Sequence, residues 1–193
     1  MKSDSGLGSR ERMIEATIAL MRGSGLSGAG INDIVRESGA PKGSVYHYFP
    51  GGKVQIATEA LAVYSERVMV FIEQALGRKR LPATKVRALF DAFARRVEEG
   101  NYRKSCAVGT VSLDLDADLE NLRVALAAAF ADWAALIARH FDLGDVQRTK
   151  SFAGLVLTAI EGAYVRCRAE RSSRPFKEAG AWLAELVARR DPD

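Results

Sequence analysis

The 193-residue sequence contains only two cysteines and two histidines. Cys106 and Cys167 form no CxxC pair, and together with His140 they lack the spacing of a zinc site or of another metal site. The sequence therefore favours two free thiols in a reducing cytoplasm over a disulfide. It also predicts no bound metal.

Long apolar runs are missing as well. The densest run, GLVLTAI at Gly154–Ile160, is much shorter than the ~20 residues that span a membrane, and arginines and lysines lie close to both of its ends. The first residues, MKSDSGLGSRERM, have no apolar core of the kind that marks a signal peptide. We expect a cytoplasmic protein without membrane association.

The chain also lacks strand-like runs bounded by turn residues, and its apolar residues recur at helical spacing instead. This periodicity predicts an all-α fold. We expect Ser9 to cap the first helix, and Gly23 and Gly25 to end it. The expected helices cover residues 10–22, 31–38, about 41–49, 53–76, 83–99, 117–141, 145–170 and 175–190, with a further short helix within 101–116.

A glycine-rich stretch between the first two predicted helices has the spacing Gly-x-Gly-x-x-Gly, in GSGLSG at 23–28. A phosphate-binding loop of this pattern needs a preceding β-strand, whereas here a helix precedes it. The glycines therefore indicate a sharp joint between two helices, and no dinucleotide or other cofactor is expected.

The segment after this joint reads as helix, glycine-containing turn and helix, which is the arrangement of a helix-turn-helix motif. A plain helical hairpin in a bundle is the alternative, but PKGSVYHY at 41–48 is too polar and aromatic for a helix buried on all sides. Lysine, serine, tyrosine and histidine side chains can bind phosphates and base edges, and a net charge of +4 is compatible with a DNA partner.

The stretch GINDIVRESGAPKGSVYHYFPGGKVQIATEAL, at 30–61, resembles the DNA-binding region of TetR/AcrR-type transcriptional repressors, and HYFPGGK resembles the LmrA/YxaF-like subgroup. The resemblance implies an N-terminal three-helix DNA-binding domain at 1–52. It also implies a C-terminal helical bundle at 53–193 that binds a small molecule and dimerises. By matched position, the residues expected to contact a palindromic DNA operator are Lys42, Gly43, Ser44, Tyr46, His47, Tyr48 and Lys53.

The chain departs from the family pattern just before the second helix. The family usually has a threonine there, which caps the helix and contacts a phosphate, whereas this chain has Ala29 followed by Gly30. A weaker cap and one fewer phosphate contact are expected. Ser27 is a candidate replacement for the missing side chain.

The resemblance favours a ligand pocket within the C-terminal bundle over a bundle that only dimerises. Aromatic and sulfur-bearing side chains are the candidate wall of this pocket, which suits an apolar or aromatic effector. The first candidates are Phe93, Cys106, Trp133 and Tyr164.

The last two helices are expected to form the dimer, as a four-helix bundle with those of a second subunit. Their apolar residues include Leu155, Val156, Ile160, Tyr164, Trp182, Leu183, Leu186 and Val187.

Two other functions stay open at this point. One is a DNA-binding regulator that has no small-molecule ligand. The other is an enzyme that uses Cys106 and His140 as a nucleophile and its base, although no acidic residue to orient the base is recognisable in the sequence. The sequence favours a non-enzymatic regulator.

Overall fold

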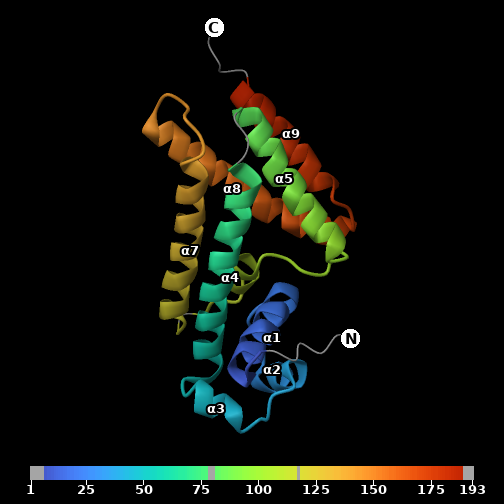
Figure 1. The fold of residues 1–193 in the computed structure, drawn as a ribbon, viewed down its shortest axis with the longest axis vertical. Helices are drawn as coiled ribbons and strands as arrows, with labels where there is room; N and C mark the ends of the chain where they lie inside the picture. Colours follow the sequence, from blue (N-terminus) through green and yellow to red (C-terminus); the bar gives the residue numbers. More distant parts are fainter. Residues whose placement is uncertain (1–6, 78–80, 117, 189–193) are drawn as a thin grey trace. The chain divides into compact units, whose positions relative to one another are not determined.

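The computed structural model describes residues 7–77, 81–116 and 118–188, and within these ranges the protein is helical without any strand, as predicted (Figure 1). The short helix expected within 101–116 is present as α6. Residue 117, where the helix expected at 117–141 begins, and residue 190, where the helix expected at 175–190 ends, lie outside the described residues. The helices are α1 (Ser9–Ser24), α2 (Ile31–Ser38), α3 (Ser44–Tyr48), α4 (Gly52–Leu76), α5 (Pro82–Glu99), α6 (Ala107–Ser112), α7 (Glu120–Ala138), α8 (Val146–Glu170) and α9 (Arg174–Ala188).

The chain folds into two compact units that each combine separate parts of the sequence. One unit holds the residues up to Ser65 together with Ala107–Ala127, and the other holds Glu66–Cys106 together with the residues from Ala128 onward. Helices α4 and α7 contribute residues to both units. These compact units are not the same as the two functional domains expected at 1–52 and 53–193. The expected domains remain a prediction about function.

The N-terminal unit is organised around α1, which packs on α2, α3 and α6. Met13, Met21, Ile34, Val45 and Phe49 are completely buried in this unit. The apolar repeat of α1 thus faces a core to which both following helices contribute, as a 3.6-residue period requires.

Both ends of α1 depend on glycine. The prediction that Ser9 caps α1 is wrong, because the N-cap is Gly8, whose backbone N–H donates to Glu11 Oε2 at 2.8 Å. Glu11 thus reaches back from the first turn and satisfies the backbone donor of the N-cap residue, as the glutamate of a capping box does. At the other end, Gly25 has a φ of 68°, and its N–H donates to the carbonyl of Met21. This conformation with positive φ is one that glycine adopts without strain.

The second unit contains a close pairing of α5 with α9, which lie side by side in Figure 1, and α8 packs on both of them. Gly180 of α9 makes the close approach possible, since a Cβ there would lie 2.6 Å from Cβ of Phe90. The Ser173 hydroxyl and the Lys177 ammonium donate to Glu98 of α5, and they hold the pKa of this carboxyl below its ordinary value. Cys106 and Cys167 are both buried, and neither forms a disulfide within the described residues.

Helix α7 is long and apolar enough to cross a membrane by length and composition alone, with a mean hydropathy of 1.4. A third of its apolar window, 33%, is buried inside the structure, where Leu122, Leu126, Trp133 and Ile137 contribute to the cores. Core helices of soluble proteins have the same length and composition, so these properties alone do not indicate a membrane span.

We predict that Gly180→Ala lowers the free energy of unfolding by about 2 kcal/mol, because the added methyl group overlaps Phe90 and forces α5 and α9 apart. Urea unfolding at a fixed protein concentration measures the change. Gly23→Ala is the matched control, since no described atom lies within 4 Å of a Cβ at this helical position. The control should be neutral or stabilising by up to about 1 kcal/mol. Equal stability of Gly180→Ala and the wild type would contradict the tight pairing.

Candidate DNA-binding surface

A helix, a turn and a second helix form the candidate recognition surface. Helix α2 ends at Gly39, which has a left-handed φ of 63°, and α3 begins at Ser44. Helix α3 has only five residues, and Val45 within it and Phe49 directly after it are completely buried. With these two side chains pointing into the core, the remaining positions of α3 turn toward solvent.

The exposed face carries most of the residues predicted to contact DNA. Lys42, Gly43, Tyr46, His47 and Tyr48 are exposed, with Tyr46 60% accessible and Tyr48 37%. The rings of His47 and Tyr48 pack edge to face at 5.0 Å. Together these side chains offer a cation, hydroxyl donors and flat rings, which are the groups that contact phosphates, sugars and base edges.

Two of the residues predicted to contact DNA, Ser44 and Lys53, are less exposed than the others. The hydroxyl of Ser44 donates to the carbonyl of Pro41 at 2.9 Å, so in this state it stabilises the start of α3. Lys53 lies half-buried in the first turn of α4. A cation there adds to the attraction of the helix N-terminus for a phosphate.

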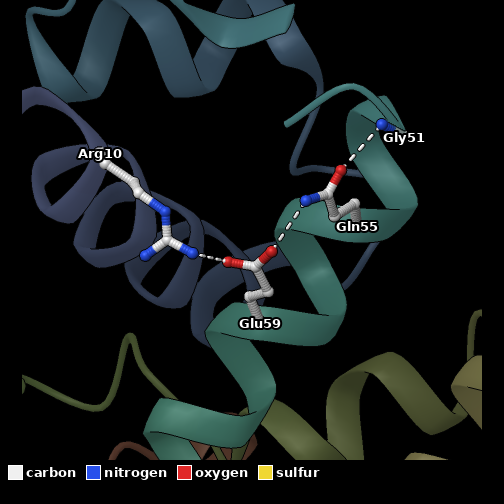
Figure 2. Close-up of polar contacts among 4 residues, drawn as sticks. All are labelled: Arg10, Gly51, Gln55 and Glu59. Atoms are coloured by element: carbon white, nitrogen blue, oxygen red, sulfur yellow. Dashed lines mark hydrogen bonds and ion pairs between the residues drawn. The ribbon is translucent and has the colours of Figure 1, made fainter. Parts of the chain in front are cut away.

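A chain of polar contacts connects the turn after α3 to α1 (Figure 2). The backbone N–H of Gly51 donates to Gln55 Oε1 at 2.8 Å, and Gln55 Nε2 donates to Glu59 Oε1 at 2.9 Å. The other carboxylate oxygen of Glu59 accepts from Arg10 of α1, and the same guanidinium lies 5.3 Å from the centre of the Phe49 ring. This network connects the turn that follows α3 to side chains of α4 and α1.

The glycine-rich joint before α2 is held from outside the helix-turn-helix motif. The N-cap of α2 is Gly30, and no side chain in the described part of the chain caps this helix. Ser27 does not replace the missing threonine, because its hydroxyl and its backbone N–H both donate to Asp114 Oδ2, at 2.7 and 2.9 Å. Ala29, at the threonine position, is buried.

Comparisons with known proteins agree with this geometry. The family model "Bacterial regulatory proteins, tetR family" matches residues 13–60, and "Transcriptional regulator LmrA/YxaF-like, C-terminal domain" matches residues 82–181. This protein belongs to the TetR family.

One relative is the uncharacterized HTH-type transcriptional regulator Rv0196 of Mycobacterium tuberculosis (strain ATCC 25618 / H37Rv), which is 31% identical over 193 residues. The match covers 96% of this chain and 97% of the relative. The chain is thus a TetR-family DNA-binding transcriptional regulator of the LmrA/YxaF-like type. Regulators of this family are typically not enzymes.

Solved structures of the family have the same fold. The regulatory protein TetR from Rhodobacter sphaeroides superposes with a TM-score of 0.83 and 20% identity, over 92% of this chain and 97% of the other. A cysteine mutant of the TetR-family regulator CifR superposes with a TM-score of 0.80 and 17% identity, over 92% of this chain and 95% of the other, and that protein was solved with a 26-base-pair operator. Identities this low establish the fold alone.

The second unit of this TetR-family protein contains all four residues predicted to bind an effector. Phe93 and Tyr164 are buried and meet edge to face at 5.8 Å. Phe176 stacks on Phe93 at 5.8 Å, and Phe71 contacts Phe93 at 4.9 Å. The structure therefore joins two of the four candidates in one aromatic cluster. Trp133 is also buried, and its ring packs against Phe130 instead.

Cys106, the fourth candidate, is buried beside a carboxyl that the sequence analysis did not select. Its thiol donates to Glu161, which lies one turn before Tyr164 on α8. Burial raises the pKa of Glu161 to about 7, against a smaller lowering by the thiol hydrogen bond. A single glutamate within the apolar stretch GLVLTAIEGAYV was the available signal in the sequence.

The alternative of a Cys106–His140 catalytic pair finds no geometric support in the contacts of these residues. His140 Nε2 lies 2.9 Å from Glu73 Oε2, and its backbone carbonyl accepts from Lys85, whereas the carboxyl partner of Cys106 is Glu161. Within residues 7–77, 81–116 and 118–188, no three histidine, cysteine, aspartate or glutamate side chains gather as a metal site would require.

We predict that Glu161→Gln changes how stability depends on pH. Because the pKa is raised in the folded state from 4.5 to about 7, the wild type loses stability as the pH rises through this interval, while the amide does not ionise. Between pH 5 and pH 8, the free energy of unfolding of the variant should therefore rise by roughly 2 kcal/mol relative to that of the wild type. Thermal unfolding in matched buffers tests this. Parallel pH profiles for the two proteins would contradict the assignment.

Proposed function

We propose that the protein is a homodimeric, ligand-responsive repressor, which leaves a palindromic DNA operator when a small apolar or aromatic effector binds. The exposed side of α3 and the turn before it carry this proposal, because a lysine, a histidine and two tyrosines are exposed there while Val45 and Phe49 are fully buried. The operator complex of CifR, a protein of the same fold, supports the DNA partner. Such a regulator acts in the cytoplasm.

Each DNA-facing residue has a role in this proposal that follows from its chemistry. Lys42 and Lys53 bind phosphates, and Tyr46, His47 and Tyr48 contact sugars, phosphates or thymine methyl groups. Gly43 has no side chain and lets the backbone approach the groove, while Ser44 holds the first turn of α3 and can donate to a phosphate.

The effector binds in the second unit, beside the side chains that were selected from the sequence. Phe93 and Tyr164 supply aromatic surface, Cys106 and Glu161 supply a polar pair, and Trp133 lies in the same unit. Effector binding releases the operator only if the DNA-incompetent state binds the effector more tightly. Two recognition helices must lie about 34–36 Å apart to reach successive major grooves, so a change in this spacing is sufficient for release.

The dimer forms through α8 and α9. Of the apolar residues selected from the sequence on these helices, Leu155, Trp182 and Leu186 are 47%, 70% and 40% exposed. The others, Val156, Ile160, Tyr164, Leu183 and Val187, are buried within their own subunit. Large exposed apolar side chains on two neighbouring helices suit a contact with a second copy.

We predict that Tyr46→Ala weakens binding to the operator by about tenfold, or roughly 1.4 kcal/mol, because the most exposed aromatic side chain of α3 is lost. Fluorescence anisotropy with the DNA upstream of the protein's own gene, at two salt concentrations, measures the loss. Tyr102→Ala, in the second unit, is the control and should bind as the wild type does. Unchanged affinity of Tyr46→Ala would refute α3 as the reading element.

We predict that Trp182→Glu converts the dimer into monomers, because a carboxylate replaces the indole that the second copy would cover. Sedimentation velocity should show the mass halved, and operator affinity should fall with it. Val70→Glu provides the control, since Val70 on α4 is also exposed, at 57%. A Trp182→Glu protein that remains dimeric would rule out this interface.

A further inference from the structure

Asp114, two residues after α6, is the hydrogen-bonding centre of the joint between α1 and α2. Its Oδ2 accepts from the backbone N–H and the hydroxyl of Ser27, and its carboxylate also accepts from the backbone of Leu26. These hydrogen bonds, led by the Ser27 backbone, hold the pKa of Asp114 below its ordinary value, and the charge of Lys53 contributes to the lowering. The carboxylate therefore stays ionised and accepts hydrogen bonds from two consecutive residues of the turn, Leu26 and Ser27.

A close steric contact at Gly25 and a hydrogen bond from Thr110 also hold the turn. A Cβ at Gly25 would lie 2.2 Å from Asp114 Oδ2, so only glycine allows the carboxylate to lie against the turn. Thr110 of α6 donates from its hydroxyl to the carbonyl of Met21 at 2.7 Å, and this carbonyl also accepts from the backbone N–H of Gly25. The segment from Thr110 to Asp114 thus holds the end of α1 and the following turn at several atoms.

The turn needs this support because α2 does not fix its own start. Gly30 is the N-cap of α2, and none of the described side chains caps the helix. Helix α2 leads through Gly39 and the turn at 40–43 into α3, so an error in the starting direction of α2 is carried into α3. The support comes from a segment that matches the C-terminal family model over residues 82–181 and yet folds into the N-terminal unit.

We propose that Asp114 is a positioning residue for DNA recognition: by clamping the α1–α2 turn to the end of α6, it fixes the uncapped start of α2 and so the direction in which α3 presents its DNA-facing side chains. This inference rests on the proposed DNA-binding function. Helix α6 begins at Ala107, directly after Cys106, so one short helix joins a candidate effector residue to the clamp.

The test compares Ser27→Ala, Asp114→Asn and the double variant in the full-length dimer. Ser27→Ala removes a hydrogen bond without changing the charge, and Asp114→Asn removes the carboxylate that receives both contacts from Ser27. Specific operator affinity should fall by about threefold for Ser27→Ala and about tenfold for Asp114→Asn. The double variant should be no weaker than Asp114→Asn, because Ser27 acts through Asp114.

Binding to unrelated DNA of the same length distinguishes a change in the direction of α3 from the effect of the lost negative charge. Loss of a negative charge close to Lys53 affects specific and non-specific DNA alike, whereas a misdirected α3 lowers only the specific affinity. The matched control is Asp118→Asn, which makes the same charge change at an exposed position and should bind as the wild type does. Specific affinities of Ser27→Ala and Asp114→Asn equal to that of the wild type, or an equal loss in Asp118→Asn, would overturn the proposal.

Hydrogen–deuterium exchange provides a readout that needs no DNA. Amides at 24–30 should exchange faster in Ser27→Ala and Asp114→Asn than in the wild type, while amides of α5 and α9 keep their protection. Unchanged exchange at 24–30 would refute the clamp even if the wild type binds its operator. A wild-type protein that binds no specific DNA would instead refute the proposed function, and exchange would still decide whether Asp114 holds the turn.

Discussion

The candidate DNA-binding surface depends on a helix, α3, that is too short to hold its own geometry. A helix of five residues forms about one turn and has little stability in isolation, so tertiary contacts must set its position. Burial of Val45 and Phe49 anchors α3 from behind. The Gly51–Gln55–Glu59–Arg10 network then connects the turn after α3 to α4 and α1 (Figure 2). The exposure of Tyr46 and His47 is a consequence of these anchors.

The helical fold was predictable because it depends on local pattern. Apolar spacing locates the long helices within a few residues, and the motif at 41–48 contains α3, whose exposed side is the candidate DNA-binding surface. The cap of α1 was assigned wrongly because glutamate at the third helical position replaced the expected serine. Asp114 and Ser27 are 87 residues apart in sequence, and no periodicity links them. Contacts of this kind follow from tertiary packing, which a single sequence does not display.

The second unit combines a tight aromatic core with a carboxyl, Glu161, whose ionisation is opposed by burial. Phe93, Tyr164 and Phe176 contact one another, so a large ligand among them would require rearrangement. Glu161 adds a carboxyl that is half protonated near neutral pH, and no charged group in the described chain contributes to this shift. A hydrogen-bond donor or a cation that binds beside this carboxyl would favour its ionised form.

The proposed function requires two copies of α3 to read DNA together, and selection of bound sequences from a random DNA library tests this most directly. We expect the wild-type protein to enrich a two-fold symmetric sequence whose half-sites lie about one turn of DNA apart. Tyr46→Ala should weaken this enrichment. Enrichment of a single, unpaired half-site, or of no sequence, would contradict the central claim that this fold acts as a dimeric reader of DNA.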